Sequence, residues 1–503
     1  MRFYDIDNAL QEAITAADRP IKLKIEIDMG SHFETVFEQD INEANFWGLK
    51  EVAGGTTARC ELLLNNPQGI YSFSHVSPGA QVKVSFSLGE GLPFFHRFNF
   101  YVDEKGIQDI RGEGRKRYVF IKMRDLSEKL RKSDEARDWT SPTVFTYSVV
   151  CDKSISEKSL VHGIAKRAGL TANDIDCSTI PVTLPYVKLR RSIWAELSSL
   201  ATAYRCHLEC PVEKPLVFAH SPYQTETLAS NEYLHTFTGN DIFYLRKTAR
   251  ADLYRNSIRL KVNMPVSLEK QEIWRYDEPP VFYDDFLQPH YPFRYPLVRE
   301  IEKGNYAAKY RIIDASGKVR NVVYADEIDT QEEAENRLDY SGGNFFYSHY
   351  DVTANYDKAS LTLQKENDSD LYKAAIHGRP IVLDLNRSSF IRDIEAVERY
   401  GTAALNVTGS YFSDYEIKRD NLPLTQYEDW VVRELAERLQ NRREFTVKTH
   451  RALFNARVGA RVKIQTKNEE LSGTINAFSF RYKRDKAFIA SFRITETGDN
   501  YAE

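Results

Sequence analysis

The sequence of 503 residues has few of the features that mark a membrane protein or an exported protein. It contains no run of 18 apolar residues, so we expect no transmembrane helix. Near the N-terminus, acidic residues interrupt the apolar core that a signal peptide requires, namely Asp5, Asp7, Glu12 and Asp18. We therefore expect the chain to be made and assembled in a cytoplasm.

Cysteine is also scarce. The five cysteines are odd in number and irregular in spacing: Cys60, Cys151, Cys177, Cys206 and Cys210. This pattern favours reduced structural thiols over a disulfide framework. The segment Cys206-His207-Leu208-Glu209-Cys210 has the residue types of a metal site. In an extended strand, however, residues four apart are about 13 Å from each other, too far to share one zinc ion. We predict no metal ligand.

A basic excess and the common catalytic motifs are absent too. The net charge is −4, which argues against wrapping a phosphate backbone. There is no His-Glu-x-x-His, no Gly-x-Ser-x-Gly and no P-loop. Gly112-Glu113-Gly114 precedes three basic residues and a strand pattern, which is typical of a hairpin. Arg442 and Arg443 lack interleaved aromatics and indicate a solvated helix end. We predict that the protein has no catalytic residue, binds no cofactor and is not an enzyme.

One segment departs from the rest in composition. Between Trp274 and Pro296 the chain holds five prolines and eight aromatic residues, which predicts an irregular insertion. The adjacent carboxylates Asp284 and Asp285 lie among these aromatics. Three interpretations are open: an interface or packing loop, a loop that contacts sugar, or a glycosidase site, which needs two acids flanking a sugar bond. Adjacent carboxylates usually diverge in direction, so the first is favoured.

Strand patterns dominate what is present. Tyr and Phe number 29 and 28, a content that suits sheets and interfaces. Residues 21–28 and 82–88 alternate apolar and polar, as half-buried strands do. A helix is predicted over 8–18. The strand patterns in residues 20–125 then predict one antiparallel sheet or barrel. Further alternation or apolar runs predict later strands at 258–262, 361–363, 381–385, 405–408, 445–448, 461–465, 473–477, 478–482 and 488–494.

Helical patterns divide these strands. A helix is predicted over 156–169, a second after the cap residue Ser192, and a third from Trp430 to Leu439. Strands at 206–210 and 216–219 complete a small α/β unit. We predict domains at 1–130 (β), 131–222 (α/β), 223–412 (a second β domain with the irregular insertion at about 265–300) and 413–503 (helix plus strands). The fold class is mainly β with α+β insertions.

The order of several short segments resembles phage tail hub proteins. In the first domain these are Gly-Thr-Thr-Ala-Arg at 55–59, Glu-Leu-Leu-Leu-Asn-Asn-Pro at 61–67, a Pro-Gly turn before Val82, and Arg-Asp-Leu at 124–126. In later domains they are the helical segments at 159–170 and 192–201, the strand at 216–218 and Arg-Val-Gly-Ala-Arg-Val-Lys-Ile at 457–464.

The resemblance implies a structural role. Members of this family have two tube-like antiparallel β-barrel domains and form a homotrimer, a pseudo-sixfold ring at the end of the tail tube. The implied partners are the tail tube or distal tail ring protein, a central spike or tip protein and the tape measure protein, with transient passage of DNA through the lumen. The implied location is the tail tip of a virion or of a phage-like contractile injection system, assembled in the bacterial cytoplasm. No needle-like repeat follows the last strand pattern, so we expect the spike to be a separate chain.

Two other functions stay open. The aromatic segment around Asp284 suits a tail-associated protein that binds carbohydrate or degrades cell wall. A multidomain surface protein built of β-sandwiches would also fit the strand pattern, although the acidic N-terminus argues against export.

Overall fold

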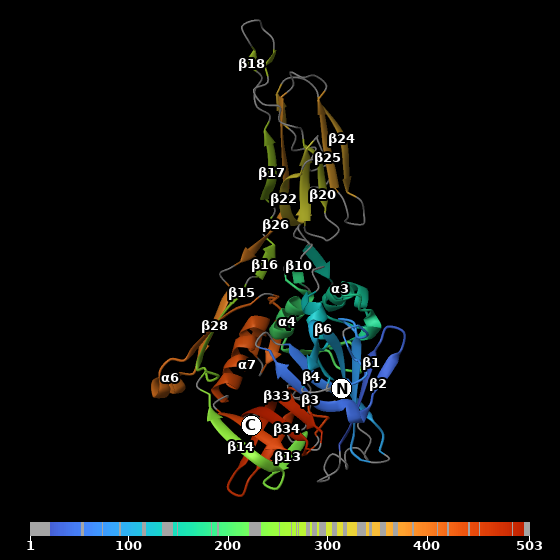
Figure 1. The fold of residues 1–503 in the computed structure, drawn as a ribbon. Coiled ribbons are helices and arrows are strands. Elements are labelled where there is room, and N and C mark those ends of the chain that lie inside the picture. The colour runs from blue at the N-terminus through green and yellow to red at the C-terminus, as the bar shows by residue number, and fades with distance from the viewer. Residues whose placement is uncertain are drawn as a thin grey trace.

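The computed structural model shows a mainly β chain with three compact parts (Figure 1). It describes residues 21–51, 55–72, 74–89, 92–112, 117–132, 144–147, 149–182, 184–188, 191–220, 233–250, 252–262, 264–267, 269, 271–277, 282–283, 289–290, 298–303, 309–314, 319–328, 339–341, 345–352, 359–365, 371–384, 387–409, 411–419, 422–440, 443–451, 453–484 and 486–496. The predicted helix at 8–18 lies outside these residues.

The first part is one large sheet built from both ends of the chain. Its strands run in the order β14-β31-β34-β33-β3-β4-β7-β6-β5-β1-β2, and β13 joins through β32, which pairs with β33. The strands are β1 (Lys22–Asp28), β2 (Phe33–Val36), β3 (Ile41–Lys50), β4 (Thr56–Asn65), β5 (Gln81–Ser87), β6 (Phe95–Arg111), β7 (Arg117–Arg124), β13 (His235–Thr238), β14 (Ile242–Ala249), β31 (Arg443–Thr449), β32 (Arg461–Gln465), β33 (Glu470–Lys483) and β34 (Ile489–Glu496).

The alternating sequence explains how this sheet is filled. In β1 the apolar residues Leu23, Ile25 and Ile27 are buried and the charged ones between them are not. Aromatic rings complete the core: Phe86 stacks on Phe454 from the C-terminal part, with ring centroids 4.1 Å apart. One hydrophobic core therefore joins segments that are hundreds of residues apart in the sequence.

A bulge in β6 depends on one glycine. The pairing of β6 with β7 shifts register between Val102 and Ile107. A Cβ at Gly106 would lie 2.5 Å from the carbonyl oxygen of Lys122. Only glycine lets the two backbones approach this closely.

The second part is the predicted α/β unit. Its helices are α2 (Leu126–Lys132), α3 (Leu160–Lys166) and α4 (Ile193–Ala203), with the 3-10 turns η3 (Ser156–Lys158) and η4 (Ala172–Asp174). Its strands are β9 (Ile175–Cys177), β11 (Cys206–Glu209) and β12 (Leu216–His220), beside a pair formed by β8 (Val144–Tyr147) and β10 (Leu184–Lys188). The predicted cap is confirmed, because the Ser192 Oγ accepts a hydrogen bond from the Ala195 N–H at 3.4 Å.

The predicted helix over 156–169 is interrupted. Ser159 adopts an extended conformation with φ −95° and ψ 125°, so the chain makes η3 first and begins α3 only at Leu160. The Ser159 hydroxyl instead meets His162 Nδ1 at 2.7 Å. Serine favours such local bonds at helix starts over a place inside a helix.

Segments from later in the sequence complete the α/β core. They are β15 (Ser257–Val262), β27 (Ser388–Arg392) and β28 (Ala404–Gly409), which form one small sheet, and α7 (Gln426–Gln440). Ile258 and Leu260 of β15 and Trp430 of α7 belong to the same buried cluster as Trp194. The short helix α6 (Ile394–Tyr400) and the β29–β30 hairpin (Glu416–Arg419, Leu422–Thr425) flank this region.

The third part, drawn at the top of Figure 1, is made of strands between 264 and 384. A sheet contains β16 (Met264–Ser267), β17 (Gln271–Asp277), β20 (Val298–Lys303), β21 (Lys309–Asp314), β22 (Val319–Ile328), β23 (Asp339–Ser341) and β26 (Leu371–Asp384). Two hairpins accompany it: β18 (Phe282–Tyr283) with β19 (Pro289–His290), and β24 (Phe345–Val352) with β25 (Ala359–Lys365).

The expectation that the chain from Trp274 to Pro296 lacks regular structure is wrong, because β17, β18 and β19 lie there. Proline is tolerated at the first residue of a strand, and Pro289 occupies that position in β19. Asp284 and Asp285 lie outside the described residues.

The predicted fold class, mainly β with α/β elements, is confirmed, but the barrel geometry is corrected. In the described part of the chain the path of the large sheet ends at β2 and β14 and does not close. The reason is that β3 pairs with β33, so strands from 1–130, 223–412 and 413–503 extend one sheet. The two strands predicted at 473–477 and 478–482 form one, β33, whose register with β34 shifts between Ile475 and Ala477.

Candidate assembly interface

Three strands of the large sheet have an unpaired side among the described residues: β2 and β14, at the two ends of its main path, and β13, which pairs only with β32. No described strand pairs with the outer side of β2 or of β14, and Figure 1 shows the two strands at opposite sides of the main body. An edge strand presents unpaired N–H and C=O groups, which can pair with another chain. The edges at β2 and β14 are therefore the first candidate for a contact surface.

Aromatic side chains accompany both edges. On β14, Phe243 and Tyr244 are 49% and 41% exposed. The Phe243 ring stacks on His450 at 4.4 Å, and Lys448 Nζ lies 4.9 Å from the Tyr244 ring. On the other edge, Phe33 of β2 is 37% exposed and lies under Lys83 Nζ at 3.9 Å. Exposed aromatics held by neighbours are typical of interface residues.

A buried ion pair holds the α/β unit on the sheet. Arg457 donates from Nη1 to Glu209 Oε1 at 2.7 Å and from Nη2 to Glu213 at 3.1 Å. His207 Nε2 lies 3.1 Å from Glu209 Oε2. Burial raises the pKa of Glu209, but the charges of His207 and Arg457 outweigh it and lower this pKa to about 2. The carboxylate is thus ionised and fully engaged.

A small cavity lies beside this pair. It has a volume of about 40 Å³, room for about three water molecules, and residues such as Asp125, Glu209 and Arg457 line it. Arg97 lines it too, and donates from Nε to the Phe454 carbonyl at 2.7 Å and from Nη2 to the Ala456 carbonyl at 2.9 Å. Because these charged groups bind one another or the backbone, the cavity suits a structural junction between parts of the fold.

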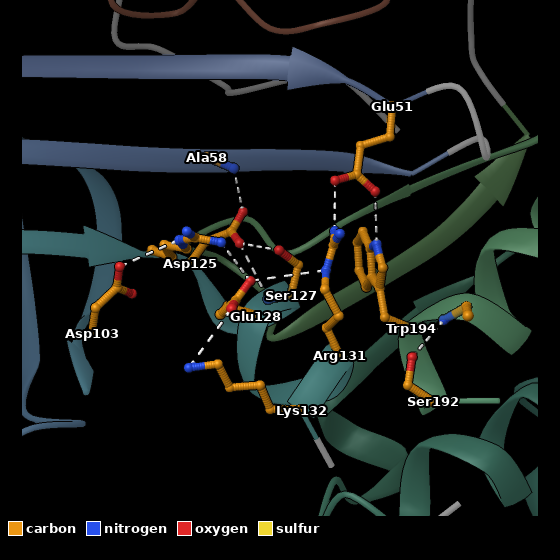
Figure 2. Close-up of polar contacts among 12 residues, drawn as sticks. Glu51, Ala58, Asp103, Asp125, Ser127, Glu128, Arg131, Lys132, Ser192 and Trp194 are labelled. Atoms are coloured by element: carbon orange, nitrogen blue, oxygen red, sulfur yellow. Dashed lines mark hydrogen bonds and ion pairs between the residues drawn. The ribbon is translucent and has the colours of Figure 1, made fainter. Parts of the chain in front are cut away.

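Figure 2 shows a second set of polar contacts at the same junction. Glu51, at the end of β3, accepts from Arg131 of α2 at 2.5 Å and from Trp194 Nε1 of α4 at 3.2 Å. Glu128 of α2 binds Arg124 Nη1 at 2.9 Å. These contacts fix α2 and α4 against the strands of the sheet.

Asp125 lies at the start of α2 and is buried (Figure 2). Its carboxylate accepts from the Ala58 N–H at 2.6 Å, from the Ser127 N–H at 3.2 Å and from the Ser127 hydroxyl. Burial raises the pKa of Asp125 to about 7, although these hydrogen bonds lower it. Among the described carboxyl groups, Asp125 is thus the one whose pKa is raised to near neutrality.

We expect Asp125 to make the fold less stable as pH rises from 4 to 7. The folded state keeps a proton that the unfolded chain, with a pKa near 3.8, has already released, so the free energy of unfolding falls with pH. A shift of about three units corresponds to about 4 kcal/mol. Urea unfolding of wild type and Asp125→Asn at several pH values measures this, and the variant should lose that part of the pH dependence.

Ser127→Ala is the matched control for this experiment. It keeps the carboxyl group and removes a hydrogen bond that lowers the pKa of Asp125, so the pH dependence should persist. Equal pH dependence in wild type and Asp125→Asn would contradict the assignment.

The structure places the other candidate residues of the sequence as follows. Cys206 and Glu209 lie on β11 and Cys210 follows it, without a shared ligand site. Arg443 begins β31 and pairs with Glu496 from Nε at 2.7 Å, and Arg442 and the residues 113–116 lie outside the described part. Sequence reasoning missed Cys151, His162 and Cys177, whose ligand atoms lie within 4.8 Å of one another. Their separations of 11 and 15 positions match no short metal motif.

None of the described helices is long and apolar enough to span a membrane.

No family model matches the sequence, and no curated protein matches it. Solved structures do align with it over most of its length. A tail protein from Neisseria meningitidis is 8% identical, with 95% of this chain and 97% of that one aligned and a TM-score of 0.48. The 43 kDa tail protein of prophage MuSo2 from Shewanella oneidensis is 10% identical, covering 94% and 98% at a TM-score of 0.46. A prophage tail protein from Listeria monocytogenes is 10% identical, covering 95% and 95% at 0.42. The three solved structures to which the chain is similar are thus tail proteins, two of them from prophages.

Proposed function

We propose that this protein is a structural subunit of a tail baseplate or tail tip, and that three copies form a hub ring. The observation that carries the proposal is the large sheet, whose main path ends at two unlike open edges, β2 and β14. An isolated chain with such edges would be prone to aggregation, whereas pairing one edge with the other edge of the next copy satisfies both.

Edge-to-edge contact between unlike surfaces has a geometric consequence. Such a contact is heterologous, so it generates a closed ring when the rotation between copies closes, and a filament when it does not. The exposed aromatics Phe33 on one edge and Phe243 and Tyr244 on the other supply apolar contact area to this interface. The number three follows from the sequence resemblance to tail hub proteins.

The proposed partners follow from a ring at the end of a tube. One face would meet the tail tube or distal tail ring protein and the other a spike or tip protein, with the tape measure protein in the lumen and DNA passing through it. The location would be the tail tip of a virion or phage-like particle. In this structural role the protein would not be an enzyme. The charged groups at the cavity beside Arg457 bind one another or the backbone, which suits a structural role.

Measuring the mass of the purified protein in solution tests the proposal. Mass photometry and sedimentation should show a species of about three times the 58.1 kDa of one chain, in equilibrium with the monomer. Replacing Phe243 and Tyr244 with Lys should weaken assembly by about tenfold or more, because lysine on an edge strand opposes pairing. Ile394→Lys, on the exposed helix α6, which is part of neither edge strand, should assemble as wild type does.

A wild-type protein that stays monomeric at micromolar concentrations and is absent from purified tails would contradict the proposal. The alternative, a tail protein that binds or degrades carbohydrate, rests on the aromatic segment around Asp284. Incubation with purified cell-wall polymer separates the two, since binding or cleavage would favour the alternative.

A further inference from the structure

Soft metal ligands are concentrated in the α/β unit. Four of the five cysteines lie between 151 and 210. Three possible ligand atoms lie within 4.8 Å of one another, one from each of Cys151, His162 and Cys177, and all three residues are buried or half-buried. These residues are 11 and 15 positions apart in the sequence, so only the fold brings them together.

Three separate elements position the ligands. Cys151 forms an antiparallel bridge with Ile180, in which the Ile180 N–H donates to the Cys151 carbonyl at 2.7 Å. His162 is in the first turn of α3, and Cys177 ends β9. Because the backbone hydrogen bonds hold both cysteine segments in place, the cluster is built into the domain.

The environment of His162 points to a ligand. The residue is only 5% exposed, and its Nδ1 lies 2.7 Å from the Ser159 hydroxyl. Its Nε2 is buried, and no hydrogen-bond partner accompanies it in the described part of the chain. Leaving a buried polar atom unpaired is costly, and a metal ion satisfies it if the ion lies on the Nε2 side of the ring. The contact to Ser159 is the kind of outer contact that orients a metal-binding histidine.

We propose that Cys151, His162 and Cys177 bind a soft divalent metal ion, with Zn²⁺ as the fitting metal. Two thiolates and an imidazole are ligands that Zn²⁺ prefers, and tetrahedral sites of cysteine and histidine are typical of it. Bond lengths of 2.0–2.3 Å place tetrahedral ligand atoms about 3.5–3.8 Å apart. The ligand atoms therefore need to approach by at most about 1 Å on binding the ion.

Two more side chains with ligand atoms, Cys206 and His220, share a sheet face with Cys177 but lie outside the group of atoms within 4.8 Å. Cys177 pairs with Phe218 on β12, and Cys206 pairs with His220 on the same strand. Residues two apart on a strand point to one face, so Cys177, Cys206 and His220 share a face of this small sheet. Cys206 Sγ already contacts His220 Nδ1 at 3.7 Å. The three ligands alone would tie α3 to the sheet, because they come from the bridge at Cys151, from α3 and from β9.

Metal analysis of protein purified without a histidine tag, in the presence of a thiol reductant, tests the proposal. We expect about one zinc per chain after dialysis against a weak chelator. The double variant with Cys151→Ser and Cys177→Ser should retain at most about one tenth of the zinc that wild type retains. Cys210→Ser is the matched control, because it removes a cysteine of the same unit that lies outside the cluster, and it should keep its zinc.

Cobalt substitution provides a second measurement that does not depend on a variant folding. Apo wild type titrated with Co²⁺ should develop the visible bands of tetrahedral cobalt and a thiolate charge-transfer band, and zinc should displace them. Chelator treatment should also lower the melting temperature of wild type. Absence of both zinc and cobalt binding by reduced, folded wild type would overturn the proposal. So would a Cys151–Cys177 disulfide found by mass spectrometry, or undiminished zinc in the folded double variant.

Discussion

Replacing Arg457 with Met is expected to lower the free energy of unfolding by about 3–5 kcal/mol. The substitution keeps an unbranched apolar side chain in place of the aliphatic part of the arginine and removes the cation, which leaves Glu209 charged, buried and without its 2.7 Å partner. Breaking one half of a buried ion pair costs more than the pair contributes, because the remaining charge keeps its desolvation penalty. Urea unfolding at pH 7, followed by tryptophan fluorescence, measures the loss.

The double variant Arg457→Met with Glu209→Gln is the control. It also removes the charge of Glu209 that has lost its Arg457 partner, so part of the lost stability should return. The pKa of Glu209 near 2 lies below the unfolded value of 4.5, so the wild-type pair stabilises the fold above about pH 4.5 and loses this contribution as pH falls towards 2. A loss below about 1 kcal/mol in Arg457→Met would show that water reaches the site.

Replacing Trp194 with Ala is expected to cost about 3–5 kcal/mol. Its side chain is 2% exposed and packs on Gly55, immediately before β4, where an added Cβ would lie 2.5 Å from Trp194 Cζ2. The alanine variant leaves a cavity at the junction of the α/β unit with the sheet and also leaves Glu51 without its 3.2 Å indole donor. Chemical denaturation followed by far-UV circular dichroism measures the effect.

Trp194→Phe separates the two causes in this prediction. It retains most of the ring contact and removes the hydrogen bond to Glu51, so it should cost about 1–2 kcal/mol. Equal losses in the Ala and Phe variants would indicate that the hydrogen bond, and not packing, accounts for the role of Trp194.

Most individual strands of the large sheet could be predicted from the sequence. The alternation of Leu23, Ile25 and Ile27 with charged residues specifies a strand with one buried face, wherever that strand lies in the fold. The same holds for β5 and β15 and, with a helical period, for α4 and its cap at Ser192. Local patterns predicted these elements correctly because the burial of one apolar face contributes most to forming them.

Predictions failed where a neighbour outweighs the local pattern. Ser159 interrupts the expected helix in an extended conformation and forms a bridge with Val149, ten residues earlier in the sequence. The strand β17 continues to Asp277, inside the stretch expected to be irregular, since it pairs with the distant strand β26. Both outcomes depend on a partner that the local sequence does not reveal.

The high strand content and the repeat of apolar residues along each strand or helix follow from the sequence alone, because they depend on which side chains are buried away from water. Only the tertiary structure decided which strands are neighbours and where the sheet ends. It alone placed Arg457 on Glu209, which is 248 residues away in the sequence, and gathered Cys151, His162 and Cys177 into one cluster. Pairing between distant segments is set by how whole faces fit together in a common core, and no local pattern of residues encodes that fit.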